Sequence, residues 1–183
     1  MCQQHRQLGR RAAIAARQAH PGRQAVIEHL QPVGLGLGVV QVARQGVGGI
    51  LQLIEPFEQD GTLVKRDRTE IERDIANYTI IEHDGVIFAC AALYPYPEAK
   101  TAEMAALTVS PQSQGQGDGE KILKRVEQRA RAMGLKSIFV LTTRTMHWFI
   151  KRGFVVVDPD WLPDARKRKY NWDRRSQVLV KKL

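Results

Sequence analysis

Apolar residues recur along most of this chain with two different periods, and together they predict a mixed α/β domain. Runs rich in β-branched and aromatic residues, typical of strands, lie at 38–43, 78–82, 86–94, 103–110, 137–142, 155–157 and 178–180. Apolar residues spaced three or four positions apart predict helices over 50–56, from 67 onward, over 120–133 and over 146–151. This order predicts an antiparallel meander at the centre of a sheet covered by helices.

Local signals predict several boundaries of these elements. Pro56 is expected to end the first helix, because proline lacks the N–H that a helix interior needs. Asp67 and Glu70 have the spacing of a capping box, which opens a helix. Gly85, which ends a His-Asp-Gly turn signal, is expected to take a positive φ in a hairpin. The helix over 120–133 is expected to bury one face, made of Ile122, Leu123, Val126, Ala130 and Met133.

The first quarter of the chain differs from the rest. Residues 1–48 hold six arginines, one acidic residue and no aromatic residue, and residues 34–38 read Gly-Leu-Gly-Leu-Gly. We therefore expect a weakly ordered basic segment over 1–45 and a folded domain over 46–183. One hypothesis is that 1–45 comes from a shifted reading frame or a misassigned start. Peptides from residues 1–40 in digests of the native protein would contradict that hypothesis.

The composition of the chain excludes several classes of protein. The 183 residues are 43% hydrophobic and 26% charged, which is ordinary for a globular chain. Neither a membrane span nor a secretory signal is evident. The chain has two cysteines, Cys2 at the terminus and Cys90 in an apolar run, so no disulfide framework is expected. A cytoplasmic protein is therefore expected. No metal-ligand spacing occurs. The net charge of +9 suits a polyanionic partner, but the sequence has no nucleic-acid-binding motif, so a phosphorylated small molecule is favoured.

A glycine-rich loop over 111–119 carries the clearest chemical signal. It joins a predicted strand to the longest predicted helix. Backbone N–H groups at such a helix start can cradle an anion, and glycines let a phosphate approach closely. A flexible connector would have the same glycine content, so this loop alone leaves both interpretations open.

The spacing of this loop resembles a known family. Gln114-x-x-Gly117-x-Gly119 is similar to the Q/R-x-x-G-x-G/A motif of the GNAT acetyltransferases, and residues 142–154 resemble their second motif. About three quarters of the chain is similar to the acetyltransferase domain of bacterial N-acetylglutamate synthases. The matching stretches are 48–51, 63–66, 89–95, 103–105, 140–144, 147–149, 169–171 and 174–176.

The resemblance implies the GNAT fold, a mixed and mostly antiparallel sheet flanked by helices. It implies direct transfer of acetyl from acetyl-CoA to the α-amine of L-glutamate, the first step of arginine biosynthesis, without an acetyl-enzyme. Residues expected to bind the acetyl-CoA are Leu107, Val109, Gln114, Gly115, Gly117, Gly119 and Glu120.

The same resemblance implies catalytic roles. Glu103 is the candidate general base, and Thr142 is expected near the leaving sulfur. By residue type alone, they would be a solvated strand-end carboxylate and a strand-forming threonine. Many relatives place a tyrosine acid where this chain has Phe149, which donates no proton, so either Tyr170 supplies the acid or the thiolate leaves unaided.

Glutamate carries two carboxylates, and arginine is their matched partner. By resemblance, Arg66 and Arg175 hold them, with Lys65, Arg174 and Ser176 as neighbouring candidates. The basic run 166–169 is interpreted as a solvated face, Cys90 as a buried structural thiol, and His147 and Trp148 as packing near the cofactor.

One departure from the family affects regulation. Nothing in residues 1–48 resembles the amino-acid-kinase-like domain that binds arginine in these synthases, so arginine feedback through that domain is not expected, and a homo-oligomer is left open. Two alternatives remain: a GNAT acetyltransferase for another amine, and an inactive acetyl-CoA-binding remnant.

Overall fold

The structure, a computed structural model, describes residues 39–41 and 46–183. The basic segment expected over 1–45 lies outside the described residues, apart from strand β1. The helices are α1 (Val47–Gln59), α2 (Arg68–Asp74), α3 (Asp118–Ala132), α4 (Met146–Ile150) and α5 (Asp164–Lys167). The strands are β1 (Val39–Gln41), β2 (Tyr78–His83), β3 (Val86–Tyr96), β4 (Thr101–Val109), β5 (Ser137–Thr142), β6 (Val155–Val157) and β7 (Gln177–Lys182).

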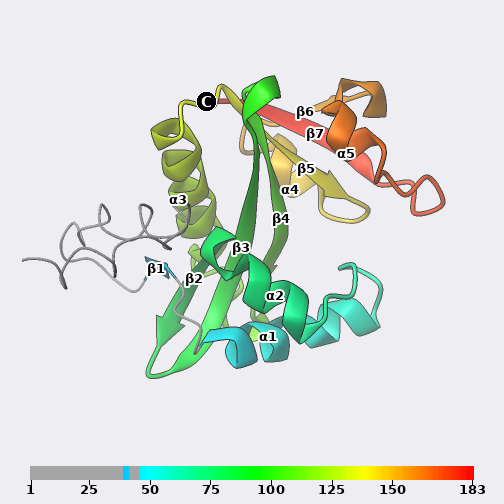
Figure 1. Cartoon of the computed structure of the whole chain (residues 1–183). Helices are drawn as coiled ribbons and strands as arrows, with labels where there is room; N and C mark the ends of the chain where they lie inside the picture. Colours follow the sequence, from blue (N-terminus) through cyan, green and yellow to red (C-terminus); the bar gives the residue numbers. More distant parts are fainter. Residues whose placement is uncertain (1–38, 42–45) are drawn as a thin grey trace, which may run out of the picture. The chain divides into compact units, whose positions relative to one another are not determined.

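The strands of the described residues form one sheet in the order β1-β2-β3-β4-β5-β7-β6 (Figure 1). Strands β1 to β4 make the expected antiparallel meander, and β7 pairs antiparallel with both β5 and β6. Only β4 and β5 run parallel. The prediction of a mixed, mostly antiparallel sheet is therefore confirmed.

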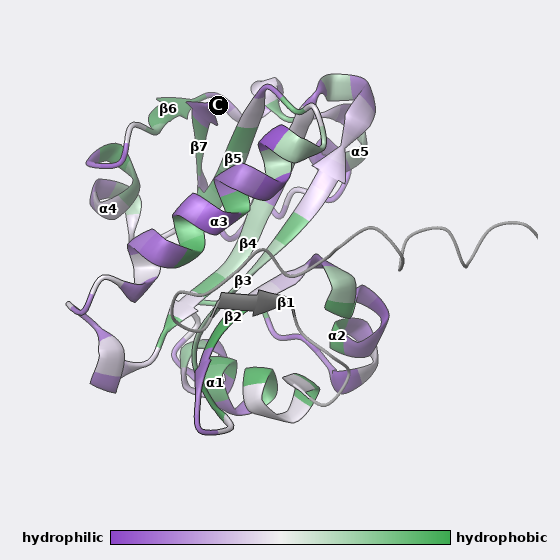
Figure 2. Ribbon diagram, turned by 90° about the vertical axis from the view of Figure 1, so that its left-hand side faces the viewer, coloured by the Kyte–Doolittle hydropathy of each residue, from purple (hydrophilic) through white to green (hydrophobic). Residues whose placement is uncertain are grey.

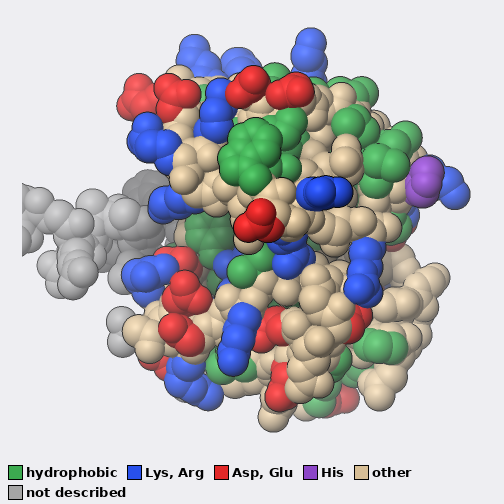
Figure 3. Space-filling model, turned by 90° about the vertical axis from the view of Figure 1, so that its right-hand side faces the viewer, with side chains coloured by type: hydrophobic (Ala, Val, Ile, Leu, Met, Phe, Trp, Pro, Cys, Tyr) green, Lys and Arg blue, Asp and Glu red, His purple; other side chains and the backbone are tan. Residues whose placement is uncertain are grey.

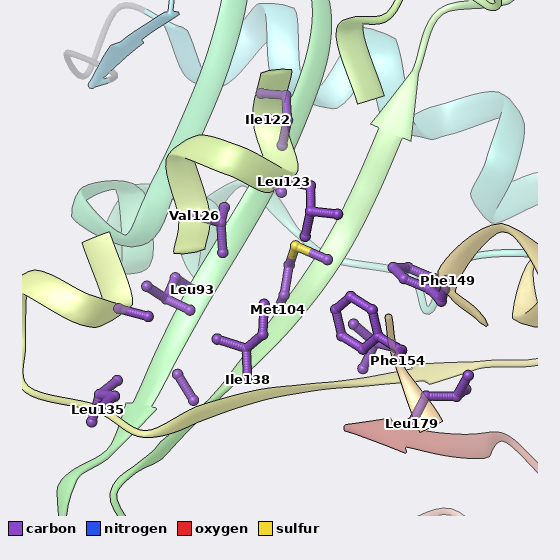
Figure 4. Close-up of a cluster of buried hydrophobic side chains, with 14 of the residues drawn as sticks. Leu93, Met104, Ile122, Leu123, Val126, Leu135, Ile138, Phe149, Phe154 and Leu179 are labelled. Carbon is purple, nitrogen blue, oxygen red and sulfur yellow. The ribbon is translucent and has the colours of Figure 1, made fainter. Parts of the chain in front are cut away.

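Helices cover both faces of this sheet, and each face has its own buried cluster. On one face α3 packs Ile122, Leu123 and Val126 against Leu93 and Met104 (Figure 4). Hydrophobic and hydrophilic residues alternate in stripes along α3, as this one-sided burial requires (Figure 2). On the other face, α1 and α2 bury a second cluster that includes Ile50, Ile54, Ile71, Tyr78 and Ile80.

Two local predictions are confirmed by the backbone. The Asp67 carboxylate accepts a hydrogen bond from the Glu70 N–H at 2.7 Å, and Glu70 accepts one from the Asp67 N–H at 3.1 Å. This reciprocal pair is a capping box and starts α2. In the β2–β3 turn, Gly85 takes a φ of +77°.

Three boundary predictions were wrong. Helix α1 continues through Pro56 to Gln59, because the turn after the proline is rebuilt by a bond from the Asp60 N–H to the Pro56 carbonyl at 3.2 Å. Helix α3 begins at Asp118 rather than Glu120, and Gly117 caps it at a φ of +85°. Met133 is 49% exposed, because it lies just beyond the last turn of α3.

The sheet opens between its two parallel strands. Pairing joins only Thr101–Glu103 to Ser137–Phe139, although both strands continue further. Ala106 has a φ of +52°, and the register with β3 shifts around it, as in a β-bulge. Beyond this point β4 and β5 diverge (Figure 1). The backbone groups of both strands that face the gap are left without a partner strand.

Candidate functional site

A cavity of about 730 Å³ occupies the gap between β4 and β5. Its walls come from both strands, from the glycine-rich loop and from α4. It reaches both sides of the sheet, because its lining includes Gly117, Gly119 and Trp148 near the start of α3 on one side. On the other side it includes Phe57 of α1 and, in the loop after that helix, Thr62 and Leu63. A long, thin ligand could therefore enter on one side and meet a second molecule that comes from the other.

The glycine-rich end of the cavity is built to approach an anion. Gly115 and Gly117 have φ values of +81° and +85°, and a Cβ added at either would meet nothing within 4 Å. No described side chain caps the start of α3. The first N–H groups of a helix have no partner within the helix, and its dipole favours negative charge there. The anion cradle predicted from the sequence thus has the required geometry and free space.

The buried carboxylate of Asp118 holds the glycine-rich loop in place. The Ser113 hydroxyl donates a hydrogen bond to Asp118, and the Lys121 ammonium lies 2.7 Å from the other carboxylate oxygen. Burial alone would raise the pKa of Asp118, but the hydrogen bonds from Lys121 and Ser113 together lower it. The Asp118 carboxylate therefore binds the Ser113 hydroxyl and the Lys121 ammonium, and these contacts order the turn before α3.

An aromatic and cationic wall stands beside this end. A Cβ on Gly119 would come within 3.0 Å of the Trp148 ring, so the start of α3 packs tightly on that side chain. The Arg152 guanidinium lies 3.7 Å from the centre of the same ring and pairs with Glu120. Arg152 was not predicted from the sequence, because it lies in the turn after α4, which ends at Ile150.

All seven residues predicted to bind acetyl-CoA line this cavity, and so does Thr142. They are Leu107, Val109, Gln114, Gly115, Gly117, Gly119 and Glu120. His147, Trp148 and Phe149 also line it, as expected for residues that pack near a cofactor. The residues that the sequence placed in one functional group are therefore neighbours in space.

Glu103 lies on the α1 side of the sheet and is 9% exposed. Both of its oxygens bind Arg166, at 2.5 Å from Nε and 3.2 Å from Nη2. Burial alone would lower the pKa of Arg166, but the hydrogen bond with Glu103 raises it. Interpreting Arg166 as part of a solvated basic face was therefore wrong, because its side chain is 17% exposed and forms this ion pair.

Two hydroxyl groups expected near the reaction are engaged in their own loops. Thr142 accepts a hydrogen bond from the Thr145 N–H at 3.1 Å, and its hydroxyl lies 2.8 Å from that of Thr145. Tyr170 is buried and donates its hydroxyl proton to the Ser176 carbonyl at 2.6 Å. That bond uses the proton Tyr170 would need as a general acid, and Tyr170 does not line the cavity.

The five residues expected to hold the substrate gather on the α1 side of the sheet, outside the cavity lining itself. Lys65 and Arg175 are exposed, and Ser176 is buried. Arg174 donates hydrogen bonds to the carbonyls of Gly61 and Thr62 rather than pointing at open space. Figure 3 shows Lys and Arg side chains around the middle of this face.

Arg66 is the most distinctive of the five. Its side chain is half-buried, and its Nε is a buried donor with no partner among the described residues. The hydroxyl of fully buried Tyr78 is likewise unpartnered. Burial raises the pKa of Tyr78, and the nearby Arg66 charge partly offsets that rise. Because buried donors normally find partners, these two are available to donate hydrogen bonds to a polar ligand at this corner.

Cys90 takes no part in the cavity. It is fully buried, and burial raises the pKa of its thiol to about 12. A thiol held in this way stays protonated and is a poor nucleophile, so its interpretation as a structural cysteine is confirmed. Among residues 46–183, no three His, Cys, Asp or Glu side chains come close enough to hold a metal ion. Nor is any helix of this described part long and apolar enough to cross a bilayer.

Comparison with known proteins gives the relatives of this chain. It is 67% identical over 137 residues to an amino-acid acetyltransferase of Ralstonia nicotianae, and 42% identical over 191 residues to one of Edwardsiella ictaluri. The solved N-acetylglutamate synthase of Neisseria gonorrhoeae, in complex with coenzyme A and N-acetyl-glutamate, is 38% identical and superposes with a TM-score of 0.78.

These matches cover 75%, 94% and 82% of this chain, respectively. The chain in turn spans only 30%, 43% and 36% of the three relatives. The sequence profile described as "Acetyltransferase (GNAT) family" matches residues 48–154, which include the divergent strands, the glycine-rich loop and α4. With this match, the chain belongs to the GNAT family of acetyltransferases.

Proposed function

We propose that the protein transfers acetyl from acetyl-CoA to the α-amine of L-glutamate. The observation that carries this proposal is the cavity that passes through the sheet, with the glycine-rich start of α3 on one side and the loop over 60–62, which Arg144 and Arg174 bind, on the other. Coenzyme A has phosphates at one end and a thiol at the end of a thin arm. The homologous synthase of Neisseria gonorrhoeae binds coenzyme A and N-acetyl-glutamate, which supports the same pair here.

The residues of this chain suit the two halves of the reaction. The N–H groups at the start of α3 would hold the phosphates, and the open edges of β4 and β5 would hold the arm. Thr142, at the end of β5, would lie near the sulfur. Because Cys90 is buried behind β4, is protonated and does not line the cavity, direct attack by the amine is favoured over an acetyl-enzyme.

Glu103 is proposed as the general base for the substrate ammonium. Its ion pair with Arg166 uses one acceptor position on each oxygen, and an ionised carboxylate has about four. A water molecule could therefore still pass a proton to Glu103. Arg66, whose Nε lacks a partner, is proposed to bind one substrate carboxylate, and Arg175 the other.

The experiment is release of thiol from acetyl-CoA in the presence of L-glutamate, L-aspartate or a polyamine, with the product identified by mass spectrometry. We expect release with L-glutamate and formation of N-acetylglutamate. Release only with another amine would contradict L-glutamate as the substrate, and a folded protein that releases no thiol with any amine would contradict the acetyltransferase activity.

A cytoplasmic location and a homo-oligomer are proposed from the resemblance to the same family.

A further inference from the structure

The loop after α1 is held by arginines from two distant parts of the chain. Arg144, from the loop after β5, donates to the Asp60 carbonyl at 3.0 Å. Arg174, from the loop before β7, donates to the carbonyls of Gly61 at 3.1 Å and Thr62 at 2.6 Å. Three consecutive carbonyls are thus bound by side chains more than 80 residues away in sequence.

These carbonyls lie just beyond the end of helix α1, which ends at Gln59, is capped by Asp60 and has no basic residue in its last turn. The carbonyls of residues 56–58 accept the main-chain N–H groups of Asp60, Leu63 and Gly61. The carbonyls of residues 60–62 follow the negative end of the helix dipole, which favours a cationic donor. Arg144 and Arg174 supply that donor from other parts of the chain.

Each of the two arginines is fixed by the turn in which it lies. The Arg144 N–H is 3.4 Å from the Thr142 hydroxyl, and the Thr145 N–H is 3.1 Å from it. The Arg174 N–H bonds to the Asn171 side chain at 3.1 Å. The arginines therefore connect three ordered loops, not three mobile ones.

The three connected loops carry the residues proposed to meet the acceptor. The loop after α1 leads to Arg66, the loop after β5 begins at Thr142, and the loop before β7 contains Arg175. Thr62 and Leu63, beside the bound carbonyls, also line the cavity. A shift of any one loop would therefore move a substrate contact relative to the others.

We propose that Arg144 and Arg174 are positioning residues that assemble the acceptor end of the cavity. They act by holding the loop after α1 against the two loops on the other side of the gap. The expected kinetic effect of this inference rests on the proposed function, whereas the contacts of the two arginines do not. Arg174 donates to both carbonyls through Nη2, so these contacts do not use its Nε or Nη1.

The test combines kinetics with hydrogen exchange on the full chain. We expect Arg144→Gln and Arg174→Gln together to raise the KM for L-glutamate by about 10-fold, and Arg174→Gln alone, which lies outside the cavity lining, to leave the affinity for acetyl-CoA unchanged. In the double variant, amides of residues 60–66 should exchange several-fold faster, while those of α3 exchange as before. Arg131→Gln is the control for each single variant, since it also removes one positive charge from an exposed arginine, here on α3.

A further variant separates positioning from simple attraction of the anionic substrate. Arg174→Lys keeps the charge, but its ammonium ends about one atom short of Nη2, which donates to both carbonyls, so we expect the KM to stay raised. A normal KM in Arg174→Lys, or unchanged exchange over 60–66 in the double variant, would overturn the proposal. If the unaltered protein acetylates no glutamate, the proposed function fails, and the exchange of residues 60–66 still decides whether the arginines hold the loop.

Discussion

Glu103 combines burial with a bidentate ion pair, and these two properties define its chemistry. Its carboxylate is 9% exposed and is held by Arg166 through two hydrogen bonds. Such a pair fixes the direction of the carboxylate and leaves further acceptor positions on its oxygens. The same pair would also serve a purely structural purpose, so only variants of both partners separate the two roles.

We expect Glu103→Gln to lower the turnover of L-glutamate by about 10²- to 10⁴-fold, the usual contribution of a general base. Glutamine keeps the shape of the side chain and one oxygen acceptor, and Glu103 lies outside the cavity lining, so acetyl-CoA should bind as before. Steady-state kinetics and calorimetric binding of acetyl-CoA check both expectations.

A second substitution distinguishes a base from an ion-pair partner. In Glu103→Gln/Arg166→Gln no charge is left unpaired, so any loss caused only by the broken pair should disappear. We expect the double variant to remain as slow as Glu103→Gln. Recovery of turnover in the double variant would show that Glu103 acts only through Arg166.

At the scale of the element, α3 connects the cavity to the core. Its apolar face packs Ile122, Leu123 and Val126 on the sheet, which fixes the helix axis (Figure 4). The same axis directs the uncapped first turn, after Gly117, toward the gap between β4 and β5. Burial of one face of α3 therefore positions its N-terminus at the proposed anion site.

Two glycines at opposite ends of α3 give a matched test of that site. Gly117 and Gly134 have φ values of +85° and +73°, and neither has an atom within 4 Å of an added Cβ. Alanine at either position costs about 1–2 kcal/mol of backbone strain. Only Gly117→Ala also adds a methyl group beside the cradle.

We expect Gly117→Ala to weaken acetyl-CoA binding by about 10-fold or more, equivalent to roughly 1.4 kcal/mol. Gly134→Ala should leave the affinity unchanged, although it should lower the melting temperature about as much as Gly117→Ala does. Isothermal titration with acetyl-CoA compares the two variants. Equal loss of affinity in both would mean that strain, and not the cradle, controls binding.

The elements that the sequence predicted well are those determined by local chemistry. The capping box at Asp67, the turn at Gly85 and the buried face of α3 depend on residues close together in the chain. The glycine-rich loop was recognised because its spacing resembles the motif of a known family. What was missed depends on partners far away: Arg166 looked solvated because Glu103 lies 63 residues earlier. The helix through Pro56 was missed for a different reason, since bonds beyond the proline rebuild the turn.

At the scale of the whole molecule, the sheet consists of two halves joined by a short parallel ladder. Only three residue pairs connect β4 to β5. Below that ladder the halves are held together by the buried cluster in which Met104, Phe149 and Phe154 take part (Figure 4). The cavity continues where this packing ends, because Met104 and Phe149 also line it. A ligand in the gap would therefore add contacts to both halves at once.

Acetyl-CoA should accordingly stabilise the folded protein as a whole. A ligand that binds only the folded state at about 100 times its Kd adds about 2.7 kcal/mol. For a chain of this size that corresponds to a rise in Tm of roughly 5–10 °C. Thermal unfolding followed by circular dichroism measures the rise. The shift should be much smaller for Gly117→Ala and fully kept in Gly134→Ala, because only the first glycine lies at the cavity. An unchanged Tm at saturating acetyl-CoA would mean that the gap between β4 and β5 does not bind it.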